Sequence, residues 1–185
     1  MQAKLGRVAG TATLALAFAQ CGGESQRETQ SGETSPITRI DACALVPKSE
    51  MEALIGAAVA STNGTFSEEE YAKPTVNTAM CMFMGERPVI VAVNYPISPA
   101  PSAESLAARI SATMRSASSG DANADALLKT TQVRPASGFE SPAAEYEMMG
   151  QTTIEVHSNS RALKVTAPSL DLARRIAQKA NERLE

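Results

Sequence analysis

The chain has 185 residues, of which 43% are hydrophobic, 4% are aromatic and none is tryptophan. This length accommodates one domain with its own core, and that core must be built from aliphatic, alanine and methionine side chains. Lysine and arginine total 17 and aspartate and glutamate total 20, which gives a net charge of −3. This acidic balance argues against nucleic acid as a partner, because binding to phosphates requires a basic patch.

Residues 1–20 have the parts of an export signal. Lys4 and Arg7 give a positive start, and an apolar run of 11 residues follows at 8–18. A bilayer-spanning helix needs about 20 apolar residues, so this run suits the apolar part of a cleaved signal peptide instead. Removing residues 1–20 leaves 15 basic and 20 acidic residues, so the mature chain has a net charge of −5.

Two cleavage sites are compatible with this signal. Ala17-Phe18-Ala19 fits the small-x-small rule, and cleavage there releases a soluble protein that begins at Gln20. The other site lies before Cys21. Phe18-Ala19-Gln20-Cys21 resembles the bacterial lipoprotein signal, Leu-Ala-Gly/Ala-Cys, at Ala19 and Cys21 and departs from it at Phe18 and Gln20. This resemblance implies that Cys21 becomes the mature N-terminus and carries the lipid anchor.

Residues 22–36 contain no apolar side chain, which is typical of a flexible tether. Fully extended, they would reach roughly 50 Å. We therefore expect a signal peptide at 1–20, a lipidated Cys21 and tether at 21–36, and one globular domain at 37–185. Gly22 does not match the inner-membrane retention signal of lipoproteins, so the resemblance implies outer-membrane placement in a cell that has one, facing the periplasm or the exterior.

The chain has three cysteines, Cys21, Cys43 and Cys81. An odd cysteine in an exported protein needs an explanation. If Cys21 carries lipid, Cys43 and Cys81 are left as a pair in an oxidising compartment. A bridge between them would close a loop of about 38 residues and stabilise the domain by roughly 4 kcal/mol in the chain-entropy model. The alternative is two buried free thiols.

The first half of the domain predicts a helix, strands and a second helix. Pro47 suits a first helical turn, Ser49 and Glu52 have capping-box spacing, and Gly56 ends the helix. Asn63-Gly64 is a hairpin signal. The expected elements are a helix within 43–57, a hairpin near 57–66, a polar loop, two strands within 76–85 and 87–96 joined at Gly85-Glu86, and a helix over 102–117 with Ser102 as its cap.

The second half predicts the same order of elements. Residues 118–125 suggest a loop, and 126–133 are ambiguous between helix and strand. Three strands of a meander are expected within 142–150, 151–160 and 161–168, with turns near Gly150 and Asn159-Ser160, before an amphipathic helix over 169–184. The expected fold class is α+β, a mainly antiparallel sheet with helices on one face and a weak repeat of strands followed by a helix.

The start of the domain carries a second resemblance. Small uncharacterised bacterial lipoprotein families open with an Asp-x-Cys-Ala-Leu-Leu-Thr-x-x-Glu-Val pattern and a glycine that ends the helix. Pro47 and Met51 replace the usual threonine and valine. The resemblance implies a lipid-tethered α+β module with a disulfide, and assigns no biochemical role. The matching residues are Asp41, Cys43, Ala44, Leu45, Glu50 and Gly56.

Methionines give the alternative function. Met80, Met82 and Met84 share one face of a predicted strand, and thioethers are soft ligands suited to copper. Met80, Met82 and the lone His157 are therefore candidate ligands of a periplasmic copper handler, or of an enzyme with a pocket on the sheet. Met80 and Met84 would be roughly 13 Å apart along a strand, so packing of the methionines in an aromatic-poor core is the interpretation we favour. We expect no metal site, and His157 should be an ordinary surface residue beside a turn.

Other catalytic and metal motifs are missing. Asp121, Asn123 and Asp125 begin like a calcium loop, but Ala126 and Gln132 stand where glycine and glutamate are required. The sequence has no Gly-x-Ser-x-Gly elbow and no glycine-rich phosphate loop. We therefore expect a non-catalytic lipoprotein without a cofactor. Its membrane contact would come through the lipid, and it would act by binding an envelope protein, a glycan or a small ligand.

Overall fold

The computed structural model describes residues 40–65, 77–117 and 120–184, which belong to one compact unit, Thr38–Glu185. The predicted signal peptide, Cys21 and the tether lie outside the described residues. Every described helix is too short or too polar to cross a bilayer. The described helices are α1 (Ala42–Leu45), α2 (Lys48–Ile55), α3 (Ala103–Ser116), α4 (Ala122–Thr130) and α5 (Leu170–Glu182), and the strands are β1 (Ala60–Thr65), β2 (Asn77–Met84), β3 (Val89–Tyr95), β4 (Val133–Pro135), β5 (Ala143–Met148), β6 (Gln151–Ser158) and β7 (Arg161–Ala167).

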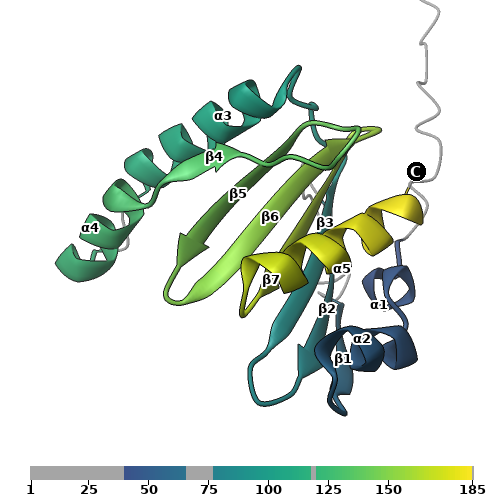
Figure 1. Ribbon diagram of the computed structural model, residues 1–185. Coiled ribbons are helices and arrows are strands. Elements are labelled where there is room, and N and C mark those ends of the chain that lie inside the picture. The colour runs from purple at the N-terminus through teal and green to yellow at the C-terminus, as the bar shows by residue number, and fades with distance from the viewer. Residues whose placement is uncertain (1–39, 66–76, 118–119, 185) are drawn as a thin grey trace, which may run out of the picture. The chain divides into compact units, whose positions relative to one another are not determined.

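The described strands form one antiparallel sheet in the spatial order β1-β2-β3-β7-β6-β5-β4 (Figure 1). Two meanders, β1 to β3 and β4 to β7, are joined where β3 pairs with β7. A helix follows each meander, α3 after β3 and α5 after β7. The α+β fold class and its mainly antiparallel sheet are therefore confirmed.

One face of the sheet forms the larger core. In the register of the strands, Cys81 lies opposite Val91, Val91 opposite Val165, and Val165 opposite Ile154. All four are fully buried. Helix α5 packs on β6 and β7, and α1 packs on β2 and β3, over this same face. Alternation along each strand explains the arrangement, since every second side chain points to the helices.

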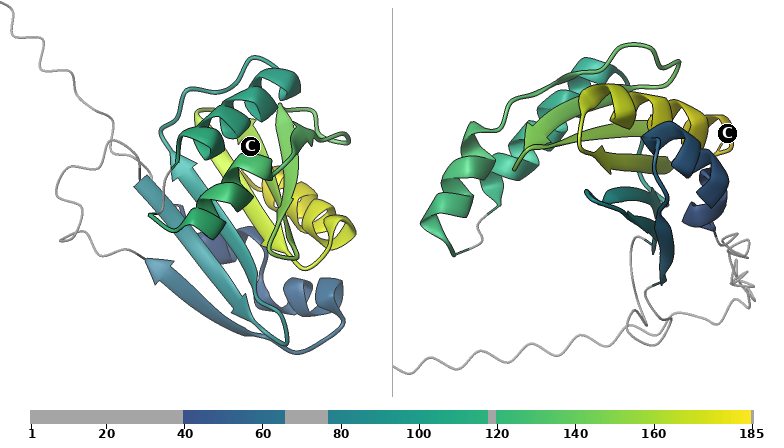
Figure 2. Two further views of the ribbon diagram at one scale, coloured as in Figure 1. Left: turned by 90° about the vertical axis from the view of Figure 1, so that its left-hand side faces the viewer. Right: turned by 60° about the horizontal axis from the view of Figure 1, so that its bottom comes forward.

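The opposite face carries the smaller core. Helix α3 packs against β4 and β5, where it meets Ala144 and Tyr146. These residues alternate along β5 with Ala143, which belongs to the larger core, so α3 and α5 lie on opposite faces of the sheet (Figure 2). The sequence predicted helices on one face only. The helices divide because β5 places apolar side chains, Ala144 and Tyr146, on the face away from α5, and α3 covers them. The apolar side of α3 comprises Leu106, Ala107, Ile110 and Met114.

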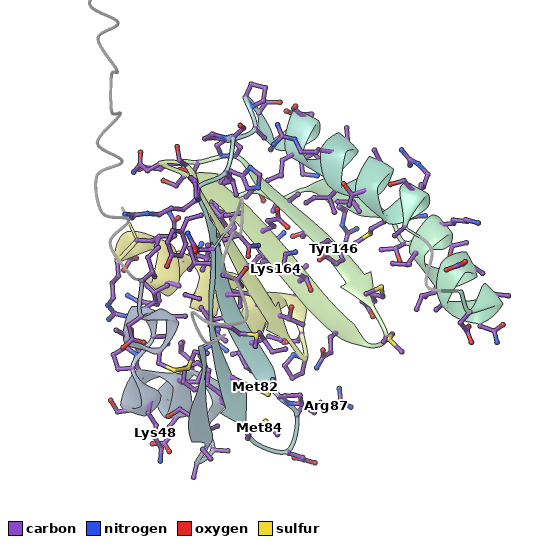
Figure 3. All side chains as sticks on the ribbon, turned by 180° about the vertical axis from the view of Figure 1, so that it is seen from behind. Lys48, Met82, Met84, Arg87, Tyr146 and Lys164 are labelled. Atoms are coloured by element: carbon purple, nitrogen blue, oxygen red, sulfur yellow. A yellow bond between two sulfur atoms is a disulfide. The ribbon has the colours of Figure 1, made fainter. Side chains whose placement is uncertain are left out.

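The methionines of β2 lie on the face opposite α5. Met80 and Met82 are half-buried there, and the Met84 side chain is 47% exposed. Figure 3 shows this face, with Met82, Lys164 and Tyr146 labelled. The prediction that Met80, Met82 and Met84 fill the core was therefore wrong. The core positions of β2 belong to the residues that alternate with them, Ala79, Cys81 and Phe83.

Proline divides the first predicted helix into two. Val46 is extended, with φ −137° and ψ 94°, because the residue before a proline disfavours the helical region. Pro47 then occupies the N-cap position of α2, where no side chain accepts a hydrogen bond. Glu52, expected in a capping box with Ser49, instead accepts a hydrogen bond from the Val59 backbone N–H at 3.1 Å. Gly56 ends the helix as predicted, with φ +77°.

Two further local predictions were wrong and one strand was not foreseen. Asn63 and Gly64 are not a turn, because they lie within β1 and pair with Cys81 and Met80 of β2. The segment predicted as a loop at 118–125 contains the start of α4, where the Asp121 side chain accepts hydrogen bonds from two backbone N–H groups at 2.8 and 2.9 Å. The short edge strand β4 was missed. The turns at 149–150 and 159–160 and the caps Ser102 and Ser169 are confirmed.

Candidate functional site

A disulfide joins Cys43 of α1 to Cys81 of β2, with a Cα–Cα distance of 5.0 Å. The Asp41 side chain accepts a hydrogen bond from the Cys43 backbone N–H at 2.9 Å, which begins α1 next to the bridge. The disulfide fastens the first helix to the larger core through the buried Cys81. Cys21, the predicted lipid anchor, lies outside the described residues.

His157 is buried, contrary to the prediction of a surface residue; its side chain is 5% exposed. The Ala100 backbone N–H donates to its Nδ1 atom at 3.2 Å. Because a backbone N–H can only donate, Nδ1 accepts, and the ring proton lies on Nε2. Nε2 in turn contacts Glu155 Oε1 at 2.9 Å. Both ring nitrogens are therefore engaged within the domain.

Glu155 links His157 to Lys164 of the neighbouring strand. Its second oxygen, Oε2, lies 3.3 Å from Lys164 Nζ. Burial alone would raise the pKa of Glu155, but the hydrogen bond from His157 and the positive charge of Lys164 outweigh it and lower the pKa below its ordinary value. Burial likewise opposes the charge of Lys164, yet Glu155 and the Tyr146 hydroxyl raise the pKa of Lys164 on balance.

The structure does not bring the candidate copper ligands together. Met80 lies on β2 and His157 on β6, with β3 and β7 between them. Three strand spacings amount to about 14 Å, too far for one ion with bonds of about 2–2.3 Å. The described part of the chain also contains no group of three histidine, cysteine or acidic side chains placed to hold a metal ion. The copper alternative therefore has no geometric support in these residues.

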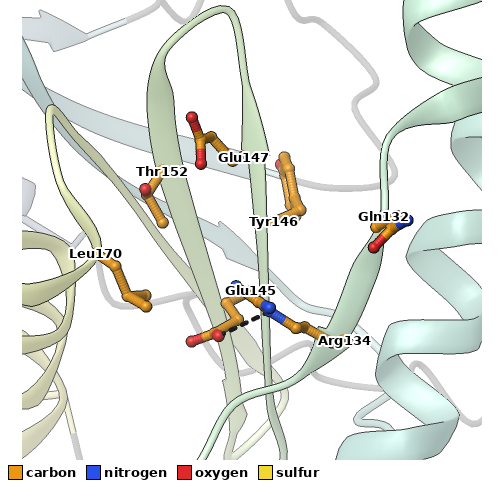
Figure 4. A pocket seen from close by; sticks show the side chains of 7 residues that line it. All are labelled: Gln132, Arg134, Glu145, Tyr146, Glu147, Thr152 and Leu170. Atoms are coloured by element: carbon orange, nitrogen blue, oxygen red, sulfur yellow. Dashed lines mark ion pairs between the residues drawn. The ribbon is translucent and has the colours of Figure 1, made fainter.

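The clearest candidate for a binding site is a hollow beside α5 (Figure 4). Its volume is about 230 Å³. Strands β4, β5 and β6 and the first residue of α5 contribute to it, on the side of the sheet that α5 only partly covers. We call it the arginine hollow. It is lined by Gln132, Arg134, Glu145, Tyr146, Glu147, Thr152 and Leu170.

Glu145 is the buried charge of the arginine hollow. Its side chain is 5% exposed, and it pairs across the strands with Ile154, at the end of the apolar row that runs from Cys81. Arg174 of α5 donates to Glu145 Oε2 through Nη2 at 2.8 Å and Nε at 3.3 Å. Arg134 Nε lies 3.1 Å from the other oxygen, Oε1. One carboxylate thus holds two guanidinium groups.

Arg134 retains donors that the domain does not use. Its side chain is 69% exposed and its contact with Glu145 is made through Nε. In the described part of the chain, neither Nη atom has a hydrogen-bond partner. The two Nη groups form the fork that binds planar carboxylates in a bidentate manner. The arginine hollow can therefore hold an anionic group of a small molecule.

Sequence patterns alone do not single out Glu145 or Arg134. In isolation, Ala143, Glu145 and Glu147 alternate along β5 like a solvent-exposed strand face. Only the neighbouring strand and α5 show that Glu145 is buried and Glu147 exposed. The two glutamates in Ala-Glu-Tyr-Glu were the available signal, and it is too common in strands to identify a site.

Comparisons with protein-family models, with curated proteins and with solved structures found no match to this chain.

Proposed function

We propose that the protein is a non-catalytic envelope lipoprotein, exported and anchored through Cys21, whose stapled domain acts by binding a small ligand or a protein. The signal-like residues 1–20 and the apolar-free stretch 22–36 support export and a tether. The opening motif of the domain, which resembles that of small bacterial lipoproteins, is consistent with the same location. The outer membrane is the proposed destination in a cell that has one.

One observation carries the proposal, namely the disulfide between Cys43 and Cys81. Disulfides persist in oxidising compartments such as the periplasm, so the bond agrees with export. It also occupies two of the three cysteines, which leaves Cys21 without an intramolecular cysteine partner. A lone cysteine directly after a signal-like segment is the position that lipid modification uses.

The binding role rests on the arginine hollow. Burying a carboxylate costs free energy of folding unless the charge is paired. An apolar residue at position 145 would continue the apolar row across the strands without that cost. Glu145 instead holds two arginines beside a small cavity. This arrangement suits the recognition of a polar ligand.

The intact mass of the mature protein, purified from membranes, tests the anchor. We expect a chain that begins at Cys21 and carries acyl groups, and a Cys21→Ala variant that is recovered in the soluble fraction. As a matched control, a Gln20→Ala variant should remain in the membrane fraction. A wild-type mass that begins at unmodified Gln20 would overturn the proposal.

A further inference from the structure

We propose that the arginine hollow binds a small zwitterion, an amino acid or a short peptide, whose carboxylate lies against Arg134 and whose ammonium lies against Glu147. This inference rests on the proposed function as a binding protein and adds the class of ligand. It requires three features: a cation held in place, an anion at a suitable separation, and a cavity of matching size.

The cation is held in place by Glu145. An exposed arginine on an edge strand normally samples many rotamers, and binding must overcome that entropy. Here the Glu145 carboxylate, itself anchored by Arg174, fixes the Nε edge of Arg134 at 3.1 Å. The Nη groups remain available for a ligand carboxylate. Glu145 is thus a positioning residue, and Arg134 makes the contact.

The anion is Glu147, two residues further along β5. Residues i and i+2 of a strand lie on the same face, about 6.7 Å apart, so the exposed Glu147 side chain borders the same hollow as Glu145. Arg134 lies opposite Glu145 in the register. Arg134 and Glu147 therefore stand one strand and two residues apart on the lining of the hollow, so that a small ligand with opposite charges at its two ends can contact both.

The remaining lining limits the size and polarity of the ligand. Gln132 and Thr152 offer neutral hydrogen-bonding groups, and Leu170 supplies an apolar wall. The volume of about 230 Å³ is below the roughly 300–1,000 Å³ of sites for drug-sized ligands. A molecule with one positive group, one negative group and a short apolar side chain matches this composition.

An NMR titration of the ¹⁵N-labelled mature protein in detergent micelles tests the proposal. The probes are alanine, alanyl-alanine, propionate and alaninamide. We expect alanine or alanyl-alanine to shift the backbone amides of Gln132, Arg134 and Thr152. Propionate and alaninamide, which each lack one charge, should bind at least about tenfold more weakly, because each charge-assisted contact is lost. The first two probes distinguish a free amino acid from a peptide.

Matched variants locate the contacts. Arg134→Gln should weaken binding of alanine or alanyl-alanine and of propionate about tenfold or more. Glu147→Gln should weaken binding of the zwitterion but leave that of propionate unchanged. Arg175→Gln, on the same helix as Arg174 but paired with exposed Asp171, is the control and should bind like the wild type.

The two proposals fail separately. If no probe shifts the amides of the arginine hollow in protein whose acylated Cys21 has been verified by mass, the zwitterion site is wrong and the lipoprotein proposal stands. Equal affinity for propionate and for both zwitterions would also overturn the ligand class. If the zwitterion binds but Cys21 carries no lipid, the anchor is wrong and the site stands.

Discussion

Glu145, which is buried, and Glu155, whose side chain is 13% exposed, lie on neighbouring strands and face opposite sides of the sheet. The partners of Glu155, His157 and Lys164, lie on its own strand and on the neighbouring one, and His157 is itself held by the Ala100 backbone. The partners of Glu145 are arginines from α5 and from the edge strand β4, and Arg134 keeps unused donors beside a cavity. Burial of a charge therefore does not by itself indicate a binding site. A binding site is indicated when a partner of that charge keeps hydrogen-bond donors that the domain does not use.

The largest expected effect on stability comes from removing the disulfide on the face of the sheet that also carries Glu145. Replacing both Cys43 and Cys81 with alanine should reduce the free energy of unfolding by roughly 4 kcal/mol, because the unfolded chain regains the entropy of a long loop. Urea unfolding followed by circular dichroism measures it, with reduced wild-type protein as the control. A loss below about 1 kcal/mol would mean that the larger core does not depend on the bond.

The next largest effect on stability is expected from replacing Glu155. Glu155→Met should destabilise the domain by about 2–3 kcal/mol, because the buried His157 Nε2–H loses its acceptor and Lys164 loses its ion pair. The value is below that of a fully buried pair because the Lys164 side chain is 37% exposed. Urea unfolding at neutral pH measures the change. A near-neutral result would remove the distinction between the two glutamates.

A smaller effect appears in the pH dependence of stability. The pKa of Glu155 is lowered in the folded state, so its contribution is complete above its ordinary pKa of 4.5 and is lost as the pH falls through the lower folded value. The pKa of Lys164 is raised, so its contribution is complete below 10.5 and is lost as the pH rises through the higher folded value. The free energy of unfolding of the wild type and of Glu155→Met is measured by urea unfolding across the pH range. The wild type should lose stability at the acidic end and at the basic end, and the variant should lack the parts of both losses that Glu155 and its pair with Lys164 cause.

The smallest effect on stability belongs to the proposed positioning residue. Glu145→Met should change the free energy of unfolding by no more than about 1 kcal/mol, since methionine extends an apolar row and the released arginines can turn to water. The same variant should bind the zwitterion about tenfold more weakly in the NMR titration. Strong destabilisation would show that Glu145 is structural, like Glu155.

Local signals predicted much of the fold. Ser102 and Ser169 begin α3 and α5 because a serine side chain satisfies exposed backbone N–H groups within three residues. The turns of the second meander were also readable from Gly150 and Asn159-Ser160. Asn63-Gly64, a strong turn signal, failed because pairing with β2 keeps these residues extended.

The candidate site could not be predicted from local sequence signals. Arg134, Glu145 and Arg174 are brought together by β4, β5 and α5, and Arg174 is 29 residues from Glu145. His157 similarly accepts its hydrogen bond from the Ala100 backbone, 57 residues away in the chain. A strand pattern shows which residues share a face, but not which neighbours cover that face.

The sequence alone determined where α3 and α5 begin, that α2 ends at Gly56, and most of the second meander. These depend on interactions within a few residues of the chain. The tertiary structure alone decided which face α3 covers, which methionines leave the core, and which of two glutamates faces a cavity. Those outcomes depend on register and on packing between distant segments, because a side chain's burial and its available hydrogen bonds are set by whatever lies across from it.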